Sequence, residues 1–349
     1  MRIRIFSLLY RFSRFIITRF IYFYQKILIK PKDLEPAIKT GDQLLKAFFV
    51  FKKVAYEFKI PSDNQVEIFD LSFPSPLIGA SFKSEVHVLD MWLKMGLGGL
   101  IFKTIMKNER KGNPRPRIQE LNVNGQKCLI NALGLPGPGL DKFIPIIINS
   151  KLWKYERPLG LSLGGENIQD YLYAINKLQV KLKELDFPYF YELNVSCPNT
   201  KNGTTIGEQT DQLDSLLREI RLNVSNVISV KVSPDVSNIT LNEIGEICAK
   251  YDSIMINAGN TQYRKTRDLG INENDFSVDG GGFSGTAIFS RTLQMVKLFS
   301  NHHIPIMATG GISSIEHIKS LRNAGASLFG IATSLVLDPY CIPDINRKL

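Results

Sequence analysis

The chain has few histidines and cysteines, the residues that most often bind zinc or form disulfides. Its 349 residues include only four histidines and four cysteines, and the cysteines are Cys128, Cys197, Cys248 and Cys341. The cysteines are far apart with no C-x-x-C spacing, and the histidines show no metal-ligand pattern. These absences argue against a zinc site and a disulfide scaffold, so we predict no metal centre and a reducing compartment.

The first thirty residues lack acidic side chains and a long apolar run. Residues 1–30 contain seven Arg and Lys and no Asp or Glu. A membrane-spanning helix needs about 18 or more consecutive apolar residues, and a signal peptide needs a cleavage site; neither is present. Aromatic and aliphatic residues interleaved with Arg favour a membrane-surface segment, on a cytoplasmic face or an organelle inner membrane. A helix packed on the protein's own body and a cleaved targeting segment are the alternatives.

Beyond this segment the chain has no strong excess of one charge. The formal net charge is +10, and the seven positive charges of residues 1–30 leave +3 for the rest. This balance gives no argument for nucleic-acid binding, so we predict no nucleic-acid partner.

Short apolar strands alternate with helical stretches from residue 66 to residue 349. Residues 31–65 are predicted as a helical connector, followed by a short hairpin in QVEIFDLSF. The predicted strands are 76–81, 98–103, 159–164, 189–195, 227–232, 253–258, 304–311 and 328–333. Eight strand–helix units predict the α/β class and a (β/α)8 TIM barrel with an N-terminal helical extension. An open doubly wound sheet is the alternative, but no G-x-G-x-x-G follows the first strand.

The ends of the predicted strands carry the unusual side chains. Lys103, Lys231 and Asn257 each end a strand, and residues 194–199 contain two asparagines and Cys197. All such ends meet at one mouth of a barrel. The stretch CLINALG, residues 128–134, is predicted as an insertion reaching over that mouth.

Glycine-rich stretches follow the last two strands. ATGGIS and GIATSL resemble the paired phosphate grip of flavin-binding barrels, and DGGGFSGTA, residues 279–287, is predicted as a further glycine-rich loop on the same side. Glycine allows backbone N–H groups to approach phosphate oxygens, so we predict a phosphate site here.

Several motifs in order resemble the dihydroorotate dehydrogenases, FMN-dependent barrels of pyrimidine synthesis. They span about residues 66–340 and include FPSPLIGAS, FKTIMKNERKGNPRPR, NALGLPGPGLD, ELNVSCPNT, VKVSPD, INAGNT, GGFSGTA, ATGGI and AGASLFGIATSLV. The resemblance implies that FMN takes a hydride from C6 of dihydroorotate while a base takes the C5 proton, giving orotate. That base is a cysteine in one branch of the family and a serine in the quinone-dependent branch, and Cys197 occupies its position.

The resemblance also implies the roles of the other site residues. Lys103 would contact both flavin and substrate, and Lys231 would lie near flavin N1. The implied substrate contacts are Asn131, Leu133, Gly134, Leu135, Asn194, Asn199 and Asn257. The implied flavin contacts, besides the two lysines, are Ala80, Ser81, Gly282, Gly310, Gly311, Ala332 and Thr333.

The chain departs from the family pattern at three positions. Gly137 and Ala258 replace a usual asparagine and serine, and Ala332 replaces a glycine of the phosphate grip. Gly137 and Ala258 leave open a related flavin oxidoreductase acting on another cyclic ene or pyrimidine. A non-enzymatic, membrane-bound flavin- or phosphate-binding protein is a further alternative, and Cys197 and the two lysines argue against it. The basic N-terminus resembles the quinone-reducing branch, so a quinone is the favoured electron acceptor; fumarate and NAD are the alternatives.

Overall fold

The computed structural model describes residues 1–196, 206–207 and 209–349. Cys197 and Asn199, two predicted site residues, lie outside the described residues. Eight parallel strands form a closed barrel, which confirms the predicted fold and excludes the open sheet. They are β3 (Leu77–Gly79), β4 (Gly99–Ile105), β7 (Leu159–Leu163), β8 (Tyr189–Asn194), β9 (Ile228–Val232), β10 (Ile254–Ala258), β13 (Ile306–Thr309) and β14 (Leu328–Ile331). Every predicted barrel strand overlaps one of them.

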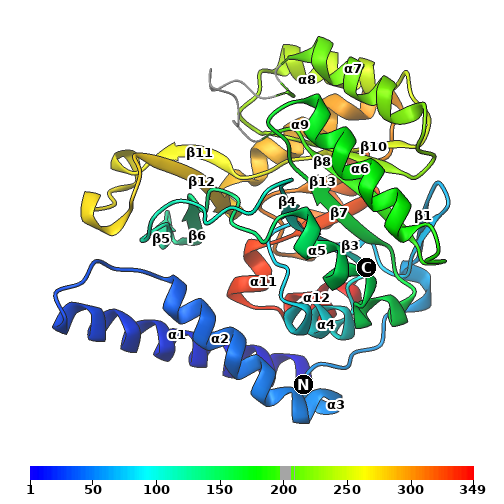
Figure 1. Cartoon of the computed structure of the whole chain (residues 1–349). Coiled ribbons are helices and arrows are strands. Elements are labelled where there is room, and N and C mark those ends of the chain that lie inside the picture. Colours follow the sequence, from blue (N-terminus) through cyan, green and yellow to red (C-terminus); the bar gives the residue numbers. More distant parts are fainter. Residues whose placement is uncertain (197–205, 208) are drawn as a thin grey trace.

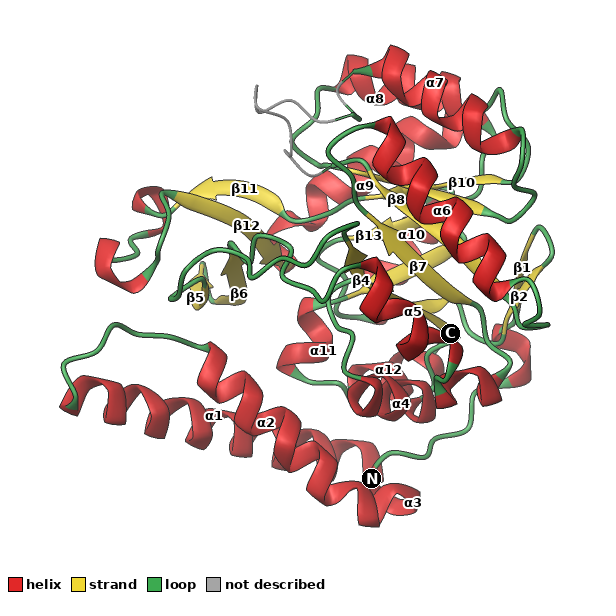
Figure 2. Ribbon diagram, viewed as in Figure 1, coloured by secondary structure: helices red, strands yellow, loops and turns green. Residues whose placement is uncertain are grey.

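Helices surround this barrel (Figures 1 and 2). They are α4 (Val86–Met95), α5 (Leu140–Ile148), α6 (Ile168–Leu182), α7 (Thr210–Arg221), α8 (Asn238–Cys248), α9 (Phe289–Phe299), α10 (Ile315–Asn323), α11 (Thr333–Leu337) and α12 (Cys341–Asn346). The side chains of Asn167, Ser237 and Ser314 accept backbone N–H bonds at the starts of α6, α8 and α10. Such caps satisfy N–H groups that have no partner within the helix.

The barrel interior changes from apolar to polar along its axis. The predicted hairpin, β1 (Val66–Ile68) and β2 (Leu71–Phe73), lies at one end. Its side chains join one apolar cluster with Ile78, Ile101, Phe190, Met255 and Met307 from the barrel strands. Glu192 and Asn257 lie two residues further along β8 and β10 than Phe190 and Met255, and both are fully buried. Glu192 and Asn257 thus lie toward the end at which the strands finish.

A small antiparallel sheet lies beside that end. It contains β5 (Ile118–Val123), β6 (Gln126–Asn131), β11 (Gln262–Lys265) and β12 (Gly280–Gly285). The predicted insertion at 128–134 is thus confirmed as lying outside the barrel. The glycine-rich stretch 279–287 is mostly strand β12 and not a loop. Glycine is needed there because a Cβ on Gly281 would approach the Asn131 carbonyl oxygen to 2.5 Å.

The N-terminal extension is a pair of long helices, α1 (Arg2–Ile27) and α2 (Glu35–Ala47), followed by the short α3 (Lys52–Ala55). They lie together at the bottom of Figure 1. One face of α1 packs on the barrel: Tyr10 donates to the Val336 carbonyl at 3.1 Å, and Phe6 stacks on Tyr340 with ring centroids 5.9 Å apart. The N-terminal helices therefore cover the place where α11 and α12 are short.

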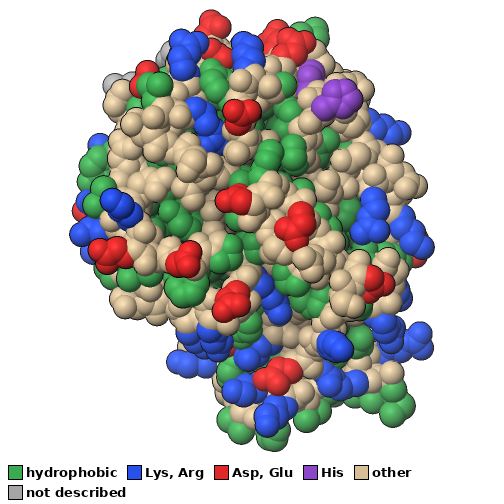
Figure 3. All heavy atoms as spheres, turned by 90° about the vertical axis from the view of Figure 1, so that its right-hand side faces the viewer, with side chains coloured by type: hydrophobic (Ala, Val, Ile, Leu, Met, Phe, Trp, Pro, Cys, Tyr) green, Lys and Arg blue, Asp and Glu red, His purple; other side chains and the backbone are tan. Residues whose placement is uncertain are grey.

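The opposite face of the extension is apolar and exposed. Figure 3 shows Lys and Arg gathered over the lower, narrower part of the molecule, with hydrophobic side chains at its lowest edge. The exposed large hydrophobic residues of α1 include Leu8, Leu9, Phe12, Phe20 and Phe23. Among the described residues, no helix combines the length and the apolar character that crossing a membrane requires.

Candidate active site

A cavity of about 540 Å³ lies at the carboxyl ends of the barrel strands. The small sheet and the segment after β6 form part of its wall. It brings together most of the predicted site residues: Ala80, Ser81, Lys103, Asn131, Leu133, Gly134, Leu135, Asn194, Lys231, Gly282, Gly310, Gly311, Ala332 and Thr333. Residues from seven barrel strands or the loops after them thus meet at one place.

Among the predicted site residues that the structure describes, Asn257 is the one that does not line the cavity. Its side chain is fully buried, and its amide nitrogen donates to Glu192 Oε2 at 2.7 Å. A carboxylate only accepts hydrogen bonds, so this contact fixes the orientation of the amide. Asn257 Oδ1 has no protein partner. Asn257 therefore lies beneath the cavity wall, with one acceptor unused.

Glu192 links Asn257 to the cationic side of the cavity. Ser81 Oγ donates to Glu192 Oε1 at 2.7 Å, and Lys231 Nζ donates to Ser81 Oγ at 3.0 Å. Buried ionised groups are stable only when they are paired or hydrogen-bonded. The sequence pattern identified Ser81 and Lys231 but missed Glu192, whose only signal was a carboxylate two residues before the end of a buried strand.

A second chain of hydrogen bonds orients the amides of the cavity. Asn260 donates to Ser196 at 2.6 Å, Ser196 donates to Asn194 Oδ1 at 2.7 Å, and Asn194 donates to Thr104 at 3.0 Å. Asn260 and Ser196 line the cavity and were missed by sequence reasoning. Asn260 reaches it because Gly259 has φ +135°, a conformation that glycine adopts without strain.

Lys103 enters the cavity wall from the end of β4. Burial lowers the pKa of its amine to about 8. The nearby Glu85 carboxylate opposes this shift, whereas the positive charge of Arg117 adds to it. Near neutral pH the side chain is still mostly charged. It can therefore hold an anionic group of a ligand at neutral pH and release it at alkaline pH.

The opposite end of the cavity fits the predicted flavin phosphate. Gly310 and Gly311 have φ of +139° and +72°, and a Cβ on Gly311 would approach the Phe289 backbone nitrogen to 2.7 Å. Bare backbone therefore lines this part of the cavity. Thr309, which precedes the two glycines, also lines it. Positive-φ glycines suit a ligand with phosphate oxygens.

Comparisons with known proteins agree with this geometry. The catalytic subunit of the NAD(+)-linked dihydroorotate dehydrogenase B of Malacoplasma penetrans is 32% identical over 255 residues, covering 72% of this chain and 80% of the relative. That of Carboxydothermus hydrogenoformans is 30% identical over 289 residues, covering 82% and 91%. A crystal structure of DHODH from Eimeria tenella in complex with ferulenol superposes with a TM-score of 0.72 at 20% identity, covering 88% of this chain and 89% of that one.

The predicted peripheral-membrane location is wrong by these comparisons. We based it on the basic, apolar segment 1–30 alone. The curated relatives are instead catalytic subunits of NAD(+)-linked enzymes. In the structure that segment is helix α1, which packs one face on α2 and the barrel. This face of α1 therefore agrees with the alternative prediction of a helix that packs on the protein's own body.

A family model for dihydroorotate dehydrogenase matches residues 64–349, which is the whole barrel together with the β1–β2 hairpin. This match and the relatives' sequence identity and coverage are independent of the cavity geometry. The chain is therefore an oxidoreductase that acts on CH–CH donors, and it belongs to the dihydroorotate dehydrogenase family.

Proposed function

We propose that the protein oxidises dihydroorotate to orotate with FMN as its cofactor. The observation that carries this proposal is the meeting of Lys103, Lys231, Asn131 and Asn194 in one cavity at the strand ends of a chain of this family. When bound, FMN supplies the acceptor for the hydride that leaves C6 of the substrate. Ala80, Ser81, Lys231, Gly282, Gly310, Gly311, Ala332 and Thr333 would hold it.

The remaining residues would bind the substrate and move its proton. Lys103 supplies a positive charge for the substrate carboxylate. Asn131 and Asn194 each offer a donor and an acceptor, which matches the alternating N–H and C=O groups of a pyrimidine ring. Cys197 directly follows Ser196, which lines the cavity, and as a thiolate it would take the C5 proton. Asn199 and Asn257 stay predicted substrate contacts.

Anaerobic reduction tests this function directly. Purified protein should carry a yellow flavin, and dihydroorotate without oxygen should bleach it. A yellow protein that dihydroorotate does not bleach would favour the related oxidoreductase acting on another cyclic ene. A chain that does not retain FMN after reconstitution would contradict the proposal as a whole.

We also propose a quinone as the electron acceptor, supported by a second cavity. It has a volume of about 380 Å³ and lies between the N-terminal helices, α4 and α11. Its walls are mostly apolar and include Phe6, Ile17, Leu34, Ala37, Trp92 and Leu335. It begins beside the first cavity, since Phe82 and Thr333 line one while Lys83 and Leu335 line the other. An apolar ring system fits such walls, whereas NAD(+) carries charged phosphates.

Filling this second cavity should separate quinone reduction from substrate oxidation. Gly41 of α2 lines it, and a Cβ at this position meets no atom within 4 Å. Gly41→Leu should therefore add a side chain to open space and lower turnover with a soluble quinone several-fold, with anaerobic bleaching unchanged. Lys39→Leu, on the exposed side of the same helix, is the matched control. Equal quinone turnover in the wild type and Gly41→Leu, or faster turnover with NAD(+) or fumarate, would contradict a quinone at this site.

A further inference from the structure

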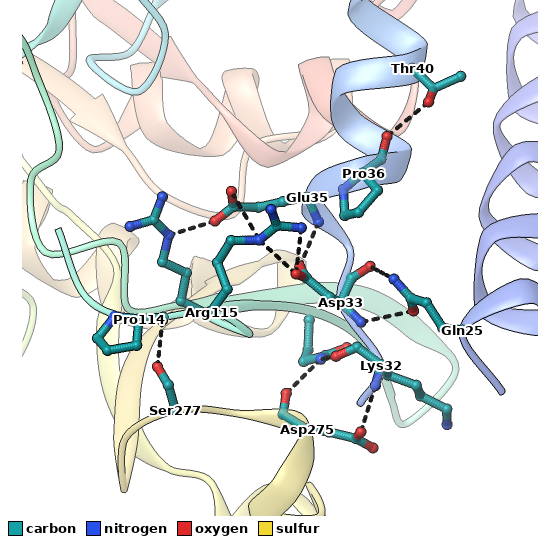
Figure 4. Close-up of polar contacts among 12 residues, drawn as sticks. Gln25, Lys32, Asp33, Glu35, Pro36, Thr40, Pro114, Arg115, Asp275 and Ser277 are labelled. Carbon is teal, nitrogen blue, oxygen red and sulfur yellow. Dashed lines mark hydrogen bonds and ion pairs between the residues drawn. The ribbon is translucent and has the colours of Figure 1, made fainter. Parts of the chain in front are cut away.

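The turn between α1 and α2 is attached to the barrel by a cluster of four charged residues. Asp33 and Glu35 face Arg115 and Arg117. Figure 4 shows Asp33, Glu35 and Arg115 of this cluster. Arg115 Nε donates to Asp33 Oδ2 at 2.7 Å, and Arg117 Nε donates to Glu35 Oε1 at 2.5 Å. The side chains of Glu35 and Arg117 are only 10% and 13% exposed. Such a pair is screened much less by salt than one at the surface.

Arg117 continues from this cluster to the loop after β6. The Nη1 atom of Arg117 donates to the Asn113 carbonyl at 2.8 Å and lies 3.5 Å from the Leu133 carbonyl oxygen. Asn113 in turn donates from its backbone to Leu133 O at 3.0 Å and from its side chain to Ala132 O at 2.9 Å. The guanidinium therefore holds the loop mainly through residue 113, and its direct contact with Leu133 is long.

This loop needs such support because its backbone is strained. Gly134 and Leu135 have φ of 69° and 51°, and both line the first cavity. A left-handed conformation is unfavourable for a non-glycine residue, so Leu135 relies on its surroundings to keep it. The same loop carries Leu133 and follows Asn131, both predicted to hold the substrate.

Glu35 is the counter-charge that keeps Arg117 in this position. Glu35 is the first residue of α2, and its backbone nitrogen donates to Asp33 Oδ1 at 2.9 Å. The backbone that carries the Glu35 carboxylate is therefore held in place. Without Glu35, a guanidinium that is largely buried would lose its nearest carboxylate and be drawn toward solvent. Glu35 also lies outside residues 64–349, which the family model matches, whereas Arg117 lies within them.

We propose that Glu35 is a positioning residue for substrate binding, which acts through Arg117 to hold residues 132–135 in their ligand-binding conformation. The N-terminal extension thereby completes a binding site whose direct contacts all come from the barrel and its loops. This inference rests on the proposed function, since it takes dihydroorotate and orotate as the ligands.

Orotate binding to the FMN-loaded full chain tests the proposal, measured by the change in the flavin absorbance. Glu35→Gln should weaken orotate binding and raise the KM for dihydroorotate, each roughly fivefold, with kcat within twofold. Arg115→Gln is the matched control. It breaks the ion pair with Asp33 and a 3.6 Å contact with Glu35, but it leaves the hydrogen bond between Arg117 and Glu35 in place. Arg115 makes no described hydrogen bond to residues 131–135. The double variant Glu35→Gln/Arg117→Gln should bind orotate no more weakly than Arg117→Gln alone, since both changes break one linkage.

Hydrogen exchange of the peptide containing residues 131–137 gives a second readout without turnover. Exchange should be faster in Glu35→Gln than in the wild type and unchanged in Arg115→Gln. Wild-type affinity and exchange in Glu35→Gln, or equal losses in the two single variants, would overturn the proposal. A wild-type protein that neither binds orotate nor is bleached by dihydroorotate would instead refute the proposed function, and the exchange comparison would still decide whether Glu35 holds the loop.

Discussion

Replacing Cys197 with alanine should slow anaerobic bleaching of the flavin by dihydroorotate by about 10²- to 10⁴-fold, the usual contribution of a general base. Orotate binding should change little, because the thiol accepts a proton and makes no implied contact that holds the ring. Stopped-flow absorbance measures the reduction rate, and the same sample titrated with orotate gives the affinity.

The three described cysteines support this choice and supply the control. Burial raises the pKa of the thiols of Cys128, Cys248 and Cys341, so none of them is a thiolate near neutral pH. None of them lines the first cavity. Dihydroorotate should therefore reduce the flavin of Cys341→Ala at the wild-type rate. Cys197→Ser should keep slow reduction that speeds up at alkaline pH, because a hydroxyl yields its proton less readily than a thiol. Wild-type reduction by Cys197→Ala would rule out the thiol as the base.

Removing the charge of Lys103 should have the second large effect. Losing one partner of a buried, hydrogen-bonded charge pair costs about 2 kcal/mol or more, so Lys103→Met should weaken orotate binding at pH 7 by about thirtyfold or more. Retention of yellow flavin through gel filtration checks that the variant is folded and loaded. A Lys103→Met protein with wild-type affinity for orotate would remove this lysine from the substrate site.

The pH dependence of binding gives an independent check on Lys103. Burial lowers its pKa to about 8, so the amine is charged below that pH and loses its proton as the pH rises through it. Orotate affinity should fall by about tenfold between pH 7 and pH 9. The charged fraction of an amine with a pKa of about 8 falls from about nine-tenths to about one-tenth over this range. The Cys197→Ala background keeps the thiol from titrating in the same range. Lys103→Met should show no such fall, and a flat wild-type profile would contradict the lowered pKa.

The sequence was sufficient to predict the barrel because its strands are short, apolar and regularly spaced. It also identified the strand-end residues Lys103, Asn194 and Lys231, because all parallel strands of a barrel finish at one mouth. It misassigned residues 279–287 because glycine runs are typical of loops. Here the missing side chains instead let β12 approach Asn131 and Thr261.

Other parts of the site could not be read from local patterns. Asn260 depends on the backbone turn at Gly259, and a strand-end rule does not extend two residues past β10. Asn257 sits at a strand end but its amide is held by Glu192 beneath the cavity. The pairing of Glu35 with Arg117 joins distant segments through side-chain geometry, and no periodic pattern indicates it.

The barrel is completed by the pairing of β14 with β3, in which Phe329 lies beside Leu77. Contacts between such remote parts of a chain form slowly, and domains assemble as units during synthesis. The barrel can therefore close only after β14 has left the ribosome. Until then the edge of β3 that pairs with β14 stays open, and an unpaired strand edge can pair wrongly with other strands.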